Sequence, residues 1–448
     1  MKLMLVLALA VTAVCASKVR YDGYQLVHVT PKSDEHVKIL AQMQGDSTKN
    51  GLMFWTEPVS VERMVDVMVP PHAFIWMART LRDNEMPYTL ADTDVQKMID
   101  EEDAENNVGL RRMRTRVGND ATQYSTILGA YQRHSTINGW LNSIASSYSN
   151  IASVFSIGKT YEGRDMRVIK IGKAGAKNKA IWIDAGIHAR EWIAPSTSLY
   201  IINQLLTGYN RDATITRLVD TFDWYILPVA NPDGYEYSHT SNRMWRKTRS
   251  PTKYSWCTGA DPNRNFDAAW NSIGTSPNPC SDTYAGDSPF SEANTRNMRD
   301  AINSLKDRMA MYLSFHSYSQ MWLTPYAYTS RRPVDYAEME RVANIGATAL
   351  QKVYGTSYIV GSPPQILYAA AGGSYDWAKM YAGVKYSYTL ELRPGRGASN
   401  GFILSPSQIT PNGREVWASV IAVTDALKLD STSGSGSGGT WGEWWGKK

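Results

Sequence analysis

Three residues in the middle of this chain have the types and the spacing of metal ligands. His188 and Glu191 are three positions apart, so one turn of the backbone brings both side chains to the same side. A single His-x-x-Glu pair is common, but the chain has only 7 His, and His316 follows another strand-like segment. Two imidazoles and one carboxylate are the ligand set of a catalytic zinc ion, whose fourth position is left for water. We therefore expect one Zn²⁺ ion at His188, Glu191 and His316.

Polar residues follow four apolar segments that have the length and composition of buried strands. These segments cover residues 180–184, 224–229, 311–315 and 386–391, and helical patterns cover residues 196–206, 291–305, 341–354 and 413–427. This alternation of strands and helices indicates one large α/β domain with a mostly parallel or mixed sheet. In such sheets ligands bind at the carboxyl ends of the strands, where the polar clusters of this sequence lie.

A smaller unit precedes this domain. Strand patterns at residues 24–29, 51–55, 64–69 and 88–90 and helical patterns at 34–43 and 73–81 follow the order β-α-β-β-α-β. This order is the ferredoxin-like arrangement. Another helix begins at residues 95–101, and the charged stretch that follows has the composition of a linker between two domains.

The charged stretch also contains a candidate processing site. Its arginines are Arg111, Arg112, Arg114 and Arg116. In an exported protein, an exposed cluster of this kind is a target for a trypsin-like protease, and Arg116 is our first choice of cleavage site. The alternative interpretation is a solvated face of a helix, which explains the charge but not the domain boundary.

The first residues predict export. Lys2 is followed by an apolar run from Leu3 to Val14 and by the small residue Ala16, the pattern of a secretory signal peptide. The run is too short to span a bilayer. The formal net charge of +5, from Lys+Arg 47 and Asp+Glu 42, is too weak to argue for a nucleic-acid partner.

Cleavage of the leader after Ala16 would remove Cys15 and leave Cys257 and Cys280. An even pair of cysteines in an exported protein favours one disulfide, and a role as metal ligands is the alternative. The segment between the two cysteines is rich in Pro, Asn and Gly, which favours a stapled loop.

Seven short motifs, all in register, carry a resemblance to a known family. They are GIHAREWI (186–193), NPDG (231–234), NRMWRKTRS (242–250), DPNRNF (261–266), HSYSQ (316–320), GGSYDW (372–377) and KYSYTLELR (385–393). Together they resemble the zinc metallocarboxypeptidases of the A/B digestive type, and the preceding segment is similar to the activation domain of their secreted zymogens. The resemblance implies a mixed eight-stranded sheet flanked by helices, preceded by the ferredoxin-like activation domain.

The same resemblance implies boundaries along the chain. We expect a signal peptide at residues 1–16, an activation propeptide at 17–116 and a catalytic domain at 117–430. Residues 431–448 form a Gly/Ser linker and a Trp-rich tail without a counterpart in the family. We also expect a secreted monomer whose partners are peptide and protein C-termini and an activating trypsin-like protease.

Roles for individual residues follow from the motifs. His188, Glu191 and His316 match the zinc ligands, and Asp261 matches the carboxylate that holds the first histidine. Glu391 matches the general base that takes a proton from water, and Arg246 matches the arginine that stabilises the oxyanion. Asn263, Arg264 and Tyr368 match the residues that bind the terminal carboxylate of the substrate, and Arg190 matches a further cationic contact along the cleft. Cys257 and Cys280 match the cysteines of the family's disulfide.

Specificity rests on one position. Tyr375 lies two residues after Gly372-Gly373, where the family places the floor of the pocket for the C-terminal side chain, and Asp376 matches a position outside that pocket. Family members that prefer Lys or Arg have an acid at the floor, so Tyr375 predicts a preference for apolar or aromatic residues. The alternatives are a basic preference and a catalytically inactive protein that binds peptide tails. The inactive alternative predicts a lost ligand or base, but all of them are present.

Overall fold

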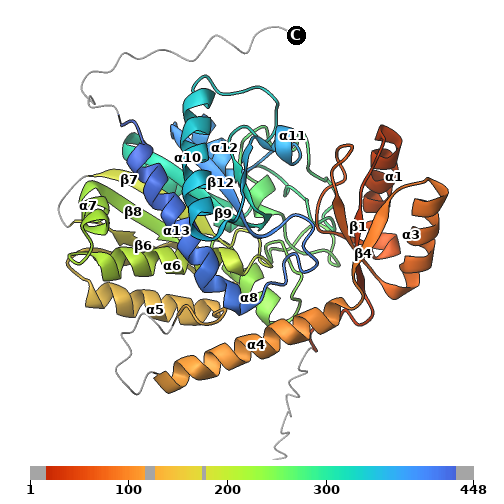
Figure 1. Cartoon of the computed structure of the whole chain (residues 1–448), viewed down its shortest axis with the longest axis horizontal. Coiled ribbons are helices and arrows are strands. Elements are labelled where there is room, and N and C mark those ends of the chain that lie inside the picture. The colour runs from red at the N-terminus through yellow and green to blue at the C-terminus, as the bar shows by residue number, and fades with distance from the viewer. Residues whose placement is uncertain (1–16, 117–126, 174–177, 430–448) are drawn as a thin grey trace, which may run out of the picture.

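The computed structural model describes residues 17–116, 127–173 and 178–429 of the 448-residue chain, which form two adjoining domains (Figure 1). The expected signal peptide, the Trp-rich tail and the bond after Arg116 lie at or outside the limits of these residues. Among the described residues, none of the helices is both long enough and apolar enough to cross a bilayer.

The smaller domain is a four-stranded antiparallel sheet in the order β2-β3-β1-β4. Its elements are β1 (Gln25–Val29), α1 (Asp34–Gly45), α2 (Ser47–Asn50), β2 (Met53–Phe54), β3 (Val65–Val69), α3 (Pro71–Asp83), β4 (Tyr88–Asp92) and α4 (Val95–Arg116). The alternation of side chains decides which face each residue covers. Val27 and Val67 pack with α1 and α3, whereas Leu26 and Met68 point toward the larger domain. The ferredoxin-like prediction is confirmed.

The larger domain is built on an eight-stranded mixed sheet in the order β11-β10-β12-β9-β7-β8-β6-β5. Its strands are β5 (Ala152–Lys159), β6 (Asp165–Ile171), β7 (Lys179–Ala185), β8 (Phe222–Leu227), β9 (Met309–Ser319), β10 (Met321–Leu323), β11 (Ile359–Gly361) and β12 (Tyr386–Gly395). The four central strands β12, β9, β7 and β8 run parallel. They are the four strands predicted from the sequence.

Helices cover both faces of this sheet (Figure 1). The helices are α5 (His134–Ser147), α6 (Ile193–Gly208), α7 (Ala213–Thr221), α8 (Pro232–Thr240), α9 (Ala293–Asn303), α10 (Tyr336–Tyr354), α11 (Pro363–Ile366), α12 (Ser374–Met380) and α13 (Ile409–Ala426). One apolar core lies between the sheet and helices α5, α6, α10 and α13, and a second lies between the sheet and α9 and α12. Parallel strands buried on both faces require this arrangement.

The sequence did not predict the edge strands. The hairpin β5–β6 lies at the rim of the sheet, where seven of the eight β5 residues are partly or fully exposed and the apolar alternation of the strand is weak. Strands β10 and β11 are three residues each, too short to give a periodic signal. The disulfide between Cys257 and Cys280 is confirmed, with a Cα–Cα distance of 4.9 Å.

The charged stretch predicted as a linker forms most of α4, which runs along the catalytic domain (Figure 1). One face of this helix lies against the catalytic domain through Glu102, Asn106 and Met113, which are buried, and Gly109, which is partly buried. Asn106 makes two hydrogen bonds with the backbone of Tyr131, at 2.6 and 3.1 Å. A Cβ at Gly109 would lie 2.3 Å from the Gly129 carbonyl oxygen, so only glycine allows this approach. Tertiary contacts therefore hold the stretch helical.

Candidate active site

Three expected metal ligands converge at the carboxyl ends of two neighbouring parallel strands. His188 and Glu191 lie in the turn between β7 and α6, and His316 lies within β9. The Nδ1 atom of His188 is 2.8 Å from a Glu191 carboxylate oxygen and 3.2 Å from Nδ1 of His316. The second Glu191 oxygen is 3.2 Å from Nδ1 of His316. The ligand atoms of the three residues lie within 4.8 Å of one another.

The donor set fits a zinc ion. Both histidines direct Nδ1 inward, and each outer Nε2 has a hydrogen-bond partner in the protein, as ligating histidines require. All three side chains are buried. A zinc ion bound here would polarise the scissile carbonyl and acidify a bound water. Although burial opposes it, the two histidines hold the pKa of the Glu191 carboxyl well below its usual range.

Asp261 holds the first histidine and an arginine together. Its Oδ1 is 3.0 Å from Nε2 of His188, and its Oδ2 accepts hydrogen bonds from Nε and Nη2 of Arg246 at 3.0 and 2.6 Å. Burial favours the neutral acid, but Arg246, His188 and Arg264 keep the pKa of Asp261 well below its usual range. A charged Asp261 therefore fixes the guanidinium of Arg246 beside the metal ligands.

Glu391 stands next to the metal ligands because of strand pairing. In the parallel pair β9 and β12, Glu391 is the register partner of His316. Burial raises the pKa of Glu391 to about 8, and Glu191 adds to this rise while His316 and Arg246 oppose it. A cation at the ligands would favour the ionised form. Glu391 is thus a buried carboxylate beside the metal ligands, in a position to exchange a proton with water bound there.

A second cationic group lies on the same wall of the site. The 3-10 turn Pro262–Arg264 follows Asp261 directly, so Asn263 and Arg264 lie close to Asp261. Arg264 donates from Nη2 to the hydroxyl of Tyr368 at 3.4 Å and from Nε to the Gly274 carbonyl at 2.9 Å. Gly372 has φ +77°, and a Cβ there would lie 2.1 Å from the Arg264 carbonyl oxygen. This glycine lets the segment before Tyr375 lie directly against the arginine.

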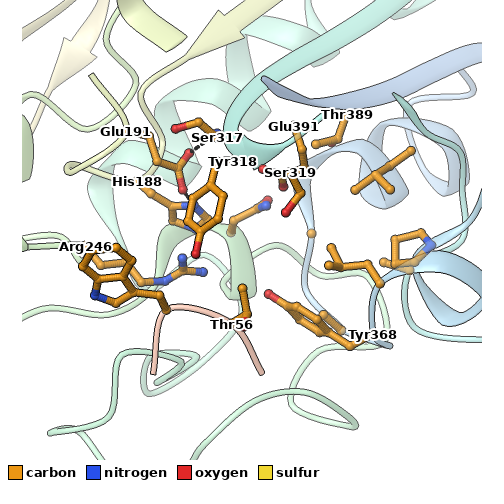
Figure 2. A pocket seen from close by; sticks show the side chains of 18 of the residues that line it. Thr56, His188, Glu191, Arg246, Ser317, Tyr318, Ser319, Tyr368, Thr389 and Glu391 are labelled. Atoms are coloured by element: carbon orange, nitrogen blue, oxygen red, sulfur yellow. Dashed lines mark hydrogen bonds and ion pairs between the residues drawn. The ribbon is translucent and has the colours of Figure 1, made fainter. Parts of the chain in front are cut away.

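Most of these groups line one cavity (Figure 2). Figure 2 shows His188, Glu191 and Arg246 on one side, and Tyr368 and Thr389 on the other. The expected site residues that line the cavity are His188, Glu191, Arg246, Asn263, Arg264, Tyr368, Tyr375 and Glu391. Tyr375 is 3% exposed, and its hydroxyl has no hydrogen-bond partner among the described residues.

Arg190 lies apart from the cavity wall. Its guanidinium sits over the ring of Phe402, 4.2 Å from the centroid, and donates to Asp282 at 3.3 Å. Phe402 lines the cavity and packs against Trp55 of the smaller domain, with ring centroids 5.4 Å apart. Arg190 is therefore one layer behind the mouth of the cavity in this structure.

Several residues at the site were not singled out from the sequence. Trp55 and Thr56 of the smaller domain line the cavity, and Thr56 is visible in Figure 2. The hydroxyl of Tyr318, on β9, donates to Asp66 of the smaller domain, which also pairs with His28 at 2.7 Å. Only the docking of the two domains brings these residues to the site, and no local motif marks them.

The fold and the site define a zinc-dependent carboxypeptidase with its activation domain attached. The family model described as "Zinc carboxypeptidase" matches residues 137–419, and the one described as "Carboxypeptidase activation peptide" matches residues 27–102. The chain belongs to this family and is a zymogen, as the sequence motifs predicted.

Relatives and solved structures that bear carboxypeptidase names are similar to this chain over most of its length. The chain is 47% identical over 300 residues to "Carboxypeptidase B" of Astacus astacus, covering 67% of this chain and 97% of that protein. It is 40% identical over 425 residues to "Zinc carboxypeptidase A 1" of Drosophila melanogaster, covering 94% and 95%. The crystal structure of carboxypeptidase A from Helicoverpa armigera gives a TM-score of 0.82 at 29% identity, covering 92% of this chain and 98% of that chain. Since the relatives bear both A and B names, the choice of C-terminal residue rests on the pocket.

Proposed function

We propose that this protein is the zymogen of a secreted exopeptidase that removes apolar or aromatic residues from peptide C-termini. The observation that carries the proposal is the single cavity that contains both a metal–carboxylate centre and a group of carboxylate-binding side chains. Arg264, Asn263 and Tyr368 line this cavity together, so we expect a bound chain to end there. An endopeptidase needs a cleft that is open at both ends.

The residues divide the chemistry between them. Arg264, with Asn263 and Tyr368, binds the terminal carboxylate, because a guanidinium matches a carboxylate with two parallel hydrogen bonds. This contact places the last peptide bond beside the metal ligands. Arg246, fixed by Asp261, donates to the oxyanion that develops on the scissile carbonyl. Glu391 takes a proton from the attacking water and delivers it to the leaving amine.

The preference for apolar residues rests on Tyr375. An incoming Lys or Arg side chain would lose its hydration against a floor that carries no counter-charge. Asp376 is adjacent in sequence, but it is completely buried, accepts a hydrogen bond from the Ala327 N–H at 2.8 Å, and is not among the residues that line the cavity. Burial of an apolar side chain contributes about 1.5–3 kcal/mol, or roughly ten- to a hundredfold in selectivity.

The test is a set of blocked dipeptides that differ only in the last residue. We expect kcat/KM to be highest for Leu, Met and Phe and about tenfold or more lower for Arg. Tyr375→Asp should reverse this order by giving the cation a partner, and Tyr375→Phe is the matched control. Faster cleavage of the Arg substrate by the unmodified enzyme would overturn the assignment.

A preference for basic residues is the second candidate, and it is favoured by the name of the Astacus relative. It requires an acid in reach of the substrate's side chain. Under that preference the Arg substrate is the best one, and Tyr375→Asp changes its kcat/KM little. The same substrate set therefore separates the two candidates.

Latency and activation complete the proposal. The smaller domain places Trp55 and Thr56 in the wall of the cavity, so we expect the uncut chain to exclude substrate. Arg111 and Arg112 are exposed near the end of α4, which supports cleavage by a trypsin-like protease in this cluster, at Arg116 as first choice. Equal rates of peptide hydrolysis before and after trypsin treatment would exclude the inhibitory role.

A further inference from the structure

The second metal-ligating histidine has its own set of buried partners, placed there by strand register. In the parallel pair β7 and β9, Asp184 lies directly opposite Ser314. His316 is two residues beyond Ser314, and Trp182 is two residues before Asp184. Because side chains two apart on a strand share a face, each pair points to one side of the sheet. All four residues are at most 1% exposed.

These residues form a hydrogen-bonded chain that ends at the metal site. The Ser314 hydroxyl donates to Oδ1 of Asp184 at 2.6 Å, and the Trp182 indole N–H donates to Oδ2 at 2.9 Å. Since the Ser314 proton is used by Asp184, its oxygen is left to accept. Nε2 of His316 lies 3.1 Å from that oxygen. These hydrogen bonds therefore favour the tautomer of His316 that carries its proton on Nε2.

That tautomer is the one the metal site needs. Nδ1 of His316 faces Glu191 and His188, so Nδ1 must be the unprotonated nitrogen that binds the metal. A partner on the outer nitrogen also fixes the angle of the ring. We propose that Ser314 and Asp184 are positioning residues for His316 that fix its tautomer and ring orientation for zinc binding.

Asp261, the carboxylate that supports His188, does not support His316 as well. Asp261 contacts His188 and also holds Arg246, and no described contact joins it to His316. Each histidine thus has its own hydrogen-bond partner. Asp261 holds both His188 and Arg246, whereas Ser314 holds His316 and has no contact with Arg246 among those described. A change at Ser314 should therefore act on the metal and leave Arg246 in place. The support of His316 by Ser314 is independent of which C-terminal residue the enzyme prefers.

The experiment measures the rate at which zinc leaves the full-length chain into excess chelator, followed with a zinc indicator. Ser314→Ala removes the acceptor for Nε2. We expect zinc to leave about 10- to 100-fold faster, in line with the loss of other outer-sphere partners of metal ligands. Ser419→Ala is the matched control, because Ser419 is also fully buried but donates to the Gly346 carbonyl on a remote helix pair.

The melting temperature of the metal-free variants separates positioning from simple loss of stability. We expect metal-free Ser314→Ala to melt close to metal-free Ser419→Ala, while only the former releases zinc faster. Asp184→Asn should act in the same direction with a smaller factor, since the amide oxygen still accepts the Ser314 proton. Equal zinc release from Ser314→Ala and the control would overturn the proposal. If Ser314→Ala does not fold, unchanged release from Asp184→Asn would overturn it instead.

Discussion

The two sheets of this molecule are buried in different ways. Helices of its own domain cover both faces of the eight-stranded sheet. The four-stranded sheet packs α1 and α3 on one face, while its other face lies on the catalytic domain (Figure 1). There Leu26 and Met68 cluster with Met244, Tyr318 and Phe402. The catalytic domain therefore completes its own core, and the activation domain relies on its neighbour to bury half of its sheet.

The difference also appears in the polar contacts between the domains. Glu102 of α4 accepts two hydrogen bonds from Arg243 at 2.6 and 3.0 Å, and both side chains are at most 5% exposed. The Arg243 guanidinium is also stacked over Trp192 at 3.7 Å. Burial raises the pKa of Glu102 in spite of the favourable effect of Arg243. A buried pair of this kind is costly to split, because the remaining charge stays buried without its partner.

Removal of the metal should have the largest effect and should affect the chemistry alone. The catalytic domain has two large apolar cores of its own, so we expect the chain to remain folded without zinc. Hydrolysis of a blocked dipeptide by trypsin-treated enzyme should fall to background after chelation and return on addition of Zn²⁺. Circular dichroism should show an unchanged fold. Full activity in protein that elemental analysis shows to be metal-free would contradict the zinc mechanism.

Glu391→Gln should have the next largest effect. The amide cannot accept the proton from water, and general-base catalysis contributes about 10²–10⁴ in rate. We expect kcat to fall by about this factor while zinc content and melting temperature are retained. Glu340→Gln, at a partly exposed carboxylate on α10, is the matched control. A near-normal kcat in Glu391→Gln would remove this residue from its role.

Glu102→Ala tests the dependence of the activation domain on its neighbour. Arg243 would remain buried without a counter-charge, which costs about 3–5 kcal/mol. We expect the uncut variant to hydrolyse peptides about 10²–10³ times faster than the uncut parent, up to the rate of the cut enzyme. The measurement is the initial rate before any protease is added, with an inhibitor of trypsin-like proteases present.

Two variants sharpen this result. Glu101→Ala changes an exposed acid on the same helix and should leave the uncut rate within about twofold, since exposed ion pairs contribute little. Replacing both Glu102 and Arg243 by Met removes the pair without leaving a charge behind, so much of the latency should return. If the uncut Glu102→Ala chain hydrolyses peptides no faster than the uncut parent, the apolar contacts alone hold the activation domain on the catalytic domain.

Much of the fold and the site was predictable because the signals are local. The strands 180–184 and 311–315 are short apolar runs bounded by polar residues, and the structure has β7 and β9 there. The motif residues from His188 to Glu391 were expected to lie together, and the cavity brings most of them together. Arg190, expected along the cleft, lies behind Phe402 in this structure, and Phe402 packs against Trp55 of the activation domain. Its role and those of the other substrate contacts stay predictions.

The limits of sequence reasoning have physical causes. The stretch from Glu101 to Arg116 has a helical face, but only Met113 in that face is apolar, and Glu102, Asn106 and Gly109 carry no apolar signal. Its helix is stabilised by partners in the other domain. His28 and Asp66 stand opposite each other on β1 and β3, yet nothing local shows that Tyr318 meets Asp66 there.

The sequence by itself determined the three zinc ligands and the order of the two domains, and it predicts the base and the arginines that would act beside the metal. These features depend on residue type and on spacing within short segments, so they can be recognised without the tertiary structure. The tertiary structure decided what surrounds them: the register that places Asp184 and Ser314 behind His316, and the docking that buries Glu102 on Arg243. Such contacts join residues 130 and 141 positions apart. Their energy comes from burial and geometry that exist only when the sheets are assembled, so no local pattern encodes them.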